Sequence, residues 1–200
     1  MDDLPKGELP DHIATYFTQK CVDDVSSAHA YDAQGFYALE VLNTLDSEHL
    51  EKARKNGAKL FNLCKAEKVA EARFLNISAK AEVALALSEG FMLSNYSFDT
   101  HKSKKSTFTM SNDQVVFSGK GSEEFEHIKI GVDSVHIARN MVNEPVSALN
   151  AQTISEEFTR LGKEAGFNVE VWNESKIESQ KFGGLLAVNK GSQEPPTFSI

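Results

Sequence analysis

The hydrophobic and polar positions of the chain switch repeatedly between strand-like and helical spacing. Residues 1–33 are polar and weakly patterned, although Ile13, Tyr16, Phe17 and Val22 favour a short helix or an edge element there. Downstream, short apolar runs bounded by turn residues alternate with longer runs at steps of three and four. Up to residue 121 this pattern predicts strands over 35–42, 72–77, 107–110 and 115–117 and helices over 46–64 and 79–93.

Local features of residues 1–121 make the prediction more specific. Asp46 or Ser47 is placed to cap the first of these helices. Gly90 lies inside the second, which indicates that another element packs closely against it. The polar run 111–114 between the last two predicted strands is typical of a hairpin turn.

A long helix is predicted from Ser122 to Asn143. Its apolar positions fall on one face and are Phe125, Ile128, Val132, Val135, Ala138 and Val142. Ser122 is placed as the cap, with two glutamates in the first turn where acids suit the positive end of the helix dipole. Pro145 disfavours helical geometry in the residue before it, so the helix should end near Asn143.

Beyond this helix the alternation is regular. Asn150 or Thr153 caps a predicted helix that leaves through Gly166, and Asn173 caps a shorter one that runs to about residue 180. Strands are predicted over 167–172 and 185–188, and a further one begins at Phe198. Strands that alternate with helices indicate an α/β fold with a mostly parallel sheet.

Composition supports a folded, acidic protein. The 200 residues are 40% hydrophobic and 25% charged, which is enough for a buried core. The formal net charge of −8 argues against a nucleic-acid surface, because such a surface needs a basic face. The basic run from His101 to Lys105 is interpreted as a solvated loop.

The sequence also predicts the cellular location of the protein. The start of the chain is acidic and lacks an apolar signal region, and no run of about 18 apolar residues is present. Cys21 and Cys64 lie far apart, which fits free thiols in a reducing compartment. We therefore expect a cytoplasmic protein with no membrane partner, in which the N-x-S sequons at Asn76, Asn95 and Asn173 are coincidental.

Local signatures of catalysis are absent from the sequence. There is no H-E-x-x-H metal motif and no G-x-S-x-G nucleophile elbow. His127 and His136 share the long helix but lie nine positions apart, so we interpret them as surface or interface histidines. Cys64 lies on an apolar helix face and is interpreted as a packed core thiol.

Two glycine segments raise the question of phosphate binding. Gly119 to Ser122 precedes a predicted helix, where backbone N–H groups can receive an anion. The segment lacks the P-loop spacing, so a turn is the preferred interpretation. Gly191 and Ser192 follow a predicted strand and are also interpreted as a turn.

Two motifs near the end of the chain carry a family resemblance. The first is the run ARNMVNEP over 138–145, in which Arg139 receives a structural role and the turn Asn143-Glu144-Pro145 redirects the chain. The second is the run FGGLLAVNKGS over 182–192, followed by Pro195 and Pro196. Together these segments resemble the leucyl (cytosol) aminopeptidase family, most strongly over residues 122–200 and more weakly upstream.

The resemblance implies a macro-domain-like N-terminal α/β domain over residues 1–121, a linker helix and turn over 122–146, and an incomplete catalytic domain over 147–200. It also implies a cytosolic metalloexopeptidase that releases N-terminal residues from peptides. Members of the family use two divalent metals, Mn or Zn, and assemble as hexamers.

The resemblance assigns no site residue to this chain. The family's metal ligands lie in a GKG-x-x-F-D-S-G-G segment and an N-T-D-A-E-G-R segment, and neither is in the sequence. Lys120 echoes the first segment only superficially, because it precedes the long helix. We therefore expect no catalytic, metal or substrate-binding residue here, an inactive chain when alone, and self-association through uncovered apolar edges. A stand-alone macro-like module that binds nucleotide or ADP-ribose is the alternative.

Overall fold

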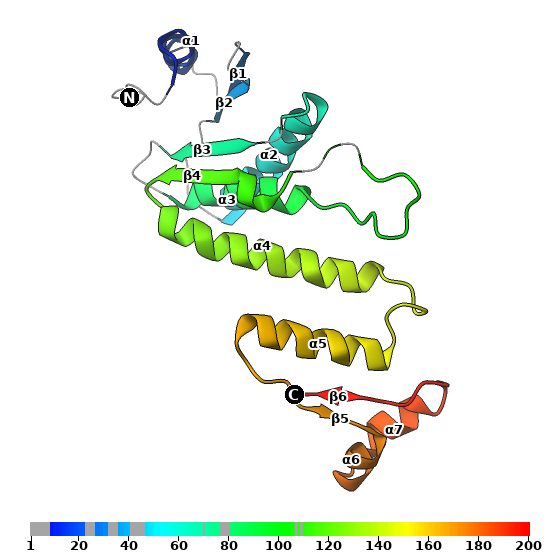
Figure 1. Cartoon of the computed structure of the whole chain (residues 1–200). Helices are drawn as coiled ribbons and strands as arrows, with labels where there is room; N and C mark the ends of the chain where they lie inside the picture. The colour runs from blue at the N-terminus through cyan, green and yellow to red at the C-terminus, as the bar shows by residue number, and fades with distance from the viewer. Residues whose placement is uncertain are drawn as a thin grey trace. The chain divides into compact units, whose positions relative to one another are not determined.

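The computed structural model describes residues 9–22, 27–31, 36–40, 47–69, 71–76, 81–106, 108 and 110–200. The protein is mixed α/β, as expected, and divides into two compact units, residues 1–136 and 137–200 (Figure 1). The long helix α4 (Ser122–Asn143) contains the division between them. Each unit is described by itself.

The first unit is built on two helices that touch through glycines. The helices are α2 (Ser47–Ala66) and α3 (Glu82–Ser94), and both confirm predicted helices. A Cβ atom added to Gly57 would lie 2.0 Å from the carbonyl oxygen of Leu87, and one added to Gly90 would lie 2.0 Å from that of Arg54. The predicted close approach at Gly90 is confirmed, and it is a backbone-to-backbone contact.

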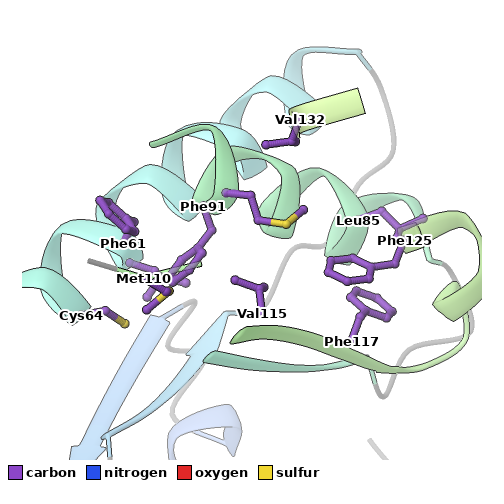
Figure 2. Packing of buried hydrophobic residues seen from close by; sticks show 11 residues of the cluster. Phe61, Cys64, Leu85, Phe91, Met110, Val115, Phe117, Phe125 and Val132 are labelled. Atoms are coloured by element: carbon purple, nitrogen blue, oxygen red, sulfur yellow. The ribbon is translucent and has the colours of Figure 1, made fainter. Parts of the chain in front are cut away.

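A parallel pair of strands packs against these helices. Strands β3 (Ala72–Asn76) and β4 (Val115–Gly119) pair with Phe74 opposite Phe117. The core between the strands and the helices is rich in aromatic rings (Figure 2). The Phe91 ring meets Phe61 and Phe74 edge-on at centroid distances of 5.4 and 5.3 Å, a favoured geometry for aromatic pairs.

The predicted hairpin over 107–117 is wrong. The residues between its supposed strands form a 3₁₀ turn, η1 (Asn112–Gln114), and β4 pairs in parallel with β3. The Ser111 hydroxyl accepts the Asp113 N–H, and the Gln114 side chain accepts the Ser111 N–H, so a capping box produces a helical turn. Phe108 and Met110 belong to no strand, while Thr107 and Thr109 lie outside the described residues.

Helix α4 has the predicted bounds and is held to the first unit at one side. Phe125 and Val132 are buried in the core, and the Phe125 ring stacks on Phe117 (Figure 2). Next to them, Asp133 accepts a 2.7 Å hydrogen bond from the buried Asn112 side chain. Lys129 forms an ion pair with the exposed Asp113 side chain.

The start of α4 differs from the prediction in one detail. Ser122 is the first helical residue and not the cap, because its hydroxyl donates to the Gly119 carbonyl. The Phe125 N–H donates to the Gly121 carbonyl, which places Gly121 at the cap position.

The N-terminal elements form a small cluster of their own. Helix α1 (Asp11–Val22) occupies the stretch for which a helix or an edge element was predicted. Strands β1 (Ser27–Tyr31) and β2 (Phe36–Glu40) pair antiparallel, and β2 confirms the core of the strand predicted over 35–42. Ile13, Phe17 and Ala28 are buried together. The predicted cap Asp46 and the strand end at Ile77 lie outside the described residues.

The second unit contains a helix and an antiparallel strand pair. Helix α5 (Ala151–Ala165) leaves through Gly166 at φ 83°, as predicted. Strand β5 (Val171–Trp172) pairs with β6 (Phe198–Ser199), so the expected parallel pairing is wrong here. The strand predicted over 167–172 is shortened, because the Phe167 N–H is used by the Gly162 carbonyl at the helix exit.

We predict opposite effects for alanine at two helical glycines. Gly90→Ala forces α2 and α3 apart and should lower the free energy of unfolding by about 1–3 kcal/mol. Gly131→Ala in α4 meets no atom within 4 Å and should raise that free energy by up to about 1 kcal/mol. Urea unfolding followed by far-UV circular dichroism measures both, and equal effects of the two substitutions would contradict the close contact at Gly90.

Candidate functional site

The turn that follows α4 is closed by backbone hydrogen bonds. The Glu144 N–H donates to the carbonyls of Asn140 and Met141, and the N–H groups of Ala148 and Leu149 both donate to the Pro145 carbonyl. These bonds stop α4 and form a single turn before the next helix. The predicted turn that redirects the chain is therefore present, and these backbone hydrogen bonds close it.

Both candidate caps of α5 are used. The Asn150 side chain accepts the N–H groups of Gln152 and Thr153, and the Asn150 N–H donates to the Thr153 hydroxyl. This reciprocal arrangement satisfies donors that a helix start otherwise leaves open. These local hydrogen bonds thereby set how many residues separate the end of α4 from the start of α5.

The second motif contains a helix where a strand was predicted. Helix α7 (Gly183–Asn189) includes the apolar run 185–188, so the strand prediction is wrong. A four-residue apolar run fits a strand or a helix equally well by its periodicity, and only the surrounding structure decides between them. Helix α6 (Glu174–Ser179) precedes it, capped by Asn173 as predicted. Trp172, Phe182 and Phe198 pack their rings together, which anchors the turn between α6 and α7 on the strand pair.

The turn after α7 is bound to α5. The Ser192 N–H donates to the Asn189 carbonyl, and the Asn189 side chain donates to the Glu194 carbonyl. The Gln152 side chain donates to the Pro195 carbonyl over 2.9 Å. Gly191 and Ser192 are thus in a turn, as predicted, although it follows a helix.

A set of hydroxyl groups joins α5 to β6. The buried Ser155 hydroxyl lies 2.7 Å from the Thr197 hydroxyl, which donates to the Ala151 carbonyl at 2.6 Å. The Ser199 hydroxyl donates to Ser155 at 3.1 Å. We call Ser155, Thr197 and Ser199 the hydroxyl set. Sequence reasoning missed it, because the residues are separated by more than forty positions and no motif marks them.

Close packing explains both glycines in the turn before α4. Gly119 has φ 93° and lies against the Asn76 carbonyl, while Gly121 has φ 105° and lies against the Ala81 side chain. The Asn76 side chain also donates to the Lys120 carbonyl. These contacts support the preferred interpretation as a turn.

The exposed position of His127 and the buried position of Cys64 agree with the interpretations made from the sequence, whereas His136 is less exposed than a surface histidine. His127 is exposed, and the His136 ring is half-buried against Tyr96. Cys64 is buried in the core, and this burial raises the pKa of its thiol. A buried thiol of raised pKa carries little of the reactive thiolate at neutral pH.

Asp99 closes the loop that carries the basic run 101–105. Its carboxylate accepts the Lys102 ammonium at 2.8 Å and the Ser106 N–H at 2.9 Å. The Lys102 hydrogen bond, followed by that from Ser106, lowers the pKa of Asp99 to about 2. The exposed positions of the run agree with a solvated loop.

Two family models match the chain. The N-terminal domain of the cytosol aminopeptidase family matches residues 45–105, and the catalytic domain of that family matches residues 136–200. The chain belongs to the cytosol aminopeptidase family. The resemblance drawn from the two sequence motifs is confirmed.

Curated relatives in the cytosol aminopeptidase family are much longer than this chain. A probable cytosol aminopeptidase from Aquifex aeolicus is 36% identical over 58% of this chain and 24% of its own length. Those from Chlorobaculum tepidum and Clostridium perfringens are 38% and 30% identical, over 60% and 75% of this chain and 26% and 33% of their own lengths. The chain thus spans a quarter to a third of these relatives.

Solved structures with a similar fold include the bottromycin maturation enzyme BotP. One BotP structure matches 86% of this chain and 39% of its own with a TM-score of 0.71, and a second, in complex with Mn, has a TM-score of 0.70. Both are 21% identical to this chain, so the likeness shows the fold alone.

The described residues do not fit the two-metal centre that the cytosol aminopeptidase resemblance implies. Within those residues, no group of three or more His, Cys, Asp or Glu side chains is arranged to hold a metal ion. We therefore derive no catalytic step through a metal from them. No helix in the described part of the chain is long and apolar enough to cross a membrane.

We predict that the hydroxyl set stabilises the second unit. Ser155→Ala removes the central hydroxyl and should lower the free energy of unfolding by about 1–2 kcal/mol. The fluorescence of Trp172, the single tryptophan, reports this unfolding because its ring packs on Phe198. Ser179→Ala is the control, since its exposed hydroxyl bonds only within α6, and a loss as large as that of Ser155→Ala would contradict the prediction.

We also predict a pH dependence of the Asp99 loop. Because the pKa of Asp99 is lowered to about 2, the hydrogen bonds that its carboxylate accepts stabilise the loop fully above the ordinary pKa of an aspartate. This stabilisation is lost as the pH falls through about 2. The amide proton resonance of Ser106 should therefore shift with a midpoint near pH 2 in NMR spectra. Asp99→Asn should abolish this shift, and a midpoint near pH 4 would show that the bonds are absent.

Proposed function

We propose that this chain supplies the N-terminal domain, the linker and the start of the catalytic domain of a metal-dependent leucyl aminopeptidase. The observation that carries the proposal is the order of the two family matches, with the N-terminal domain at 45–105 and the catalytic domain at 136–200 on one chain. The complete enzyme hydrolyses the first peptide bond of peptide substrates. It acts in the cytoplasm as a homo-oligomer, a hexamer as the resemblance implies.

The proposed division of labour follows the predicted bounds. Residues 1–121 form a macro-like domain, residues 122–146 form the linker helix and turn, and residues 147–200 begin the catalytic domain. The continuous α4 helix and the capped start of α5 support this division, because each sets the path of the chain by local hydrogen bonds. Their role in the enzyme is to position the catalytic domain.

The chemistry of the proposed enzyme belongs to segments that this sequence lacks. The family's two ligand segments, GKG-x-x-F-D-S-G-G and N-T-D-A-E-G-R, are not in the sequence. Two divalent ions, Mn or Zn, would activate the attacking water when bound to such ligands. The turn 189–196 and the strand β6 would lead the chain toward that centre, and we assign no catalytic, metal or substrate-binding residue within residues 1–200.

The alternative of a stand-alone nucleotide or ADP-ribose module receives no specific support. It draws on the turn from Gly119 to Ser122 as an anion site. Both glycines of this turn have packing contacts that account for them, and the Lys120 carbonyl is held by Asn76. We therefore retain the aminopeptidase proposal.

We predict that residues 1–200 alone do not hydrolyse leucine p-nitroanilide, with or without added Mn²⁺ or Zn²⁺, because the chain lacks the ligand segments. Release of nitroaniline measured by absorbance tests this. The matched comparison is the open reading frame continued beyond codon 200 in the source genome. If that frame encodes the two ligand segments, its product should be active with the same ions.

Turnover by residues 1–200 themselves would overturn the assignment of the metal site to other segments. A continued reading frame that encodes both ligand segments, yet a product that is inactive under every ion tested, would overturn the aminopeptidase proposal itself.

A further inference from the structure

Asn56 and Gly57 form the single Asn-Gly pair of the sequence, and they lie in α2 at a close backbone contact with α3. A Cβ atom added to Gly57 would lie 2.0 Å from the Leu87 carbonyl oxygen and 2.8 Å from the Phe91 backbone nitrogen, both in α3. Gly57 is buried, and Asn56 before it is half-buried. Close packing thus requires a glycine at a position that directly follows an asparagine.

An asparagine that precedes glycine readily loses its side-chain amide, because glycine has no Cβ atom to hinder attack by its own backbone nitrogen. The Gly57 nitrogen bonds to the Asn56 Cγ atom and releases its proton to water. The Cγ–Nδ2 bond breaks, and the side-chain nitrogen takes up a proton and leaves as ammonia. Water then hydrolyses the resulting five-membered imide at one of its two carbonyls. One product is aspartate, and the other is isoaspartate, in which the main chain passes through Cβ and Cγ of residue 56.

The folded first unit opposes this ring closure. Within an α-helix the N–H of residue 57 donates to the carbonyl of residue 53, and Ala53 is fully buried, with 0% exposure. The ring also needs the Asn56 Cβ atom and the Gly57 nitrogen nearly eclipsed about the Cα–C bond, and the helical ψ of about −42° holds them apart. Rotation about that bond would displace Gly57, which has no free space beside Leu87. The reaction therefore requires α2 to separate from α3.

We propose that Asn56 is a modification site that reacts when α2 and α3 separate and is protected while they are in contact. Conversion of Asn56 then records how long the first unit has been open. The 2.7 Å ion pair between Arg54 and Glu89 joins the same two helices and adds to the protection. Because a folded domain is open in a fraction of about 10⁻³ to 10⁻⁶ of its molecules, the protection should be strong.

Isoaspartate at residue 56 prevents the two helices from closing again. It adds one carbon atom to the main chain of α2 and displaces every later residue of that helix. Phe61 is then out of register with the core, and its edge-on contact with Phe91 is lost. Aspartate adds a negative charge alone, and Lys52 and Lys59 lie about one helical turn away on either side, where they favour that charge. The isomer, rather than the charge, therefore damages the fold.

Peptide mapping of the 200-residue chain by mass spectrometry tests the protection. The chain is incubated at neutral pH, either folded or in urea above its unfolding midpoint, and conversion of residue 56 is followed with time. We expect the folded chain to react more slowly by roughly a hundredfold or more, in line with its small open fraction. At urea concentrations below the midpoint, the rate should rise in proportion to the unfolded fraction measured by far-UV circular dichroism. A folded chain that reacts at the unfolded rate, or a rate independent of urea, would overturn the proposal.

Two substitutions locate the protection in the contact between α2 and α3. Gly90→Ala weakens this contact and should speed the conversion of residue 56 in the folded chain by roughly fivefold or more. Ser155→Ala is the matched control, because it weakens the second unit, and it should change the rate by less than about twofold. Equal acceleration by the two substitutions would overturn the proposal. If Gly90→Ala does not fold, the urea series on the unaltered chain decides.

Refolding after modification tests the consequence for the fold. The chain is kept in urea until residue 56 is converted and is then diluted into buffer, and the recovery of helical circular dichroism is measured. Asn56→Gln, treated in the same way, lacks the reactive pair and should recover at least about twice as much signal. Asn56→Asp carries the charge without the extra main-chain carbon, and it should fold without prior incubation as the unaltered chain does. Equal recovery by the modified chain and Asn56→Gln, or failure of Asn56→Asp to fold, would overturn the role given to the isomer.

Discussion

The first unit depends on the backbone contact between α2 and α3. Gly57 and Gly90 remove the side chains that would hold these helices apart, so carbonyl oxygens lie where Cβ atoms would otherwise be. The contact brings Phe61 of α2 and Phe91 of α3 edge to face above the strand pair. Phe91 then meets Phe74 of β3, and the buried side of β4 completes the core. A substitution at either glycine would therefore disturb the packing of the two helices, of the strand pair and of α4.

The second unit is stabilised in another way. Its described strands are short, and few of its apolar side chains are buried, with Ile177 as the clearest case. Hydrogen bonds take a larger share: the Asn150 cap fixes the start of α5, and the hydroxyl set binds α5 to β6. A small unit with little apolar burial gains limited hydrophobic stabilisation, so these polar contacts matter more than they would in a large core.

The family match and the long helix α4 bear on each other. The match to the catalytic domain begins at residue 136, which is also where the first compact unit ends. Both positions lie within α4, so one continuous helix connects the two units along the chain.

The sequence by itself determined the elements whose signals are local. The capped starts at Asn150 and Asn173, the exit at Gly166 and the full extent of α4 follow from side chains within a few residues of each end. The motif pair was also sufficient for the family. A site could not be predicted beyond these motifs, since the sequence holds no ligand segment to place.

Only the tertiary structure decided the features that depend on distant partners. The run 185–188 is apolar in either conformation, and it became a helix through its surroundings. Strand β4 pairs with β3 because η1 turns the chain and the side chains of Val115 and Phe117 are buried in the core. The hydrophobic periodicity of the segment does not encode this strand partner. The hydroxyl set joins residues more than forty positions apart, and the backbone contacts at Gly57 and Gly90 join helices that are distant in the sequence. Local bonding fixes where helices begin and end, whereas pairing, burial and exposure are settled by which segments meet in space.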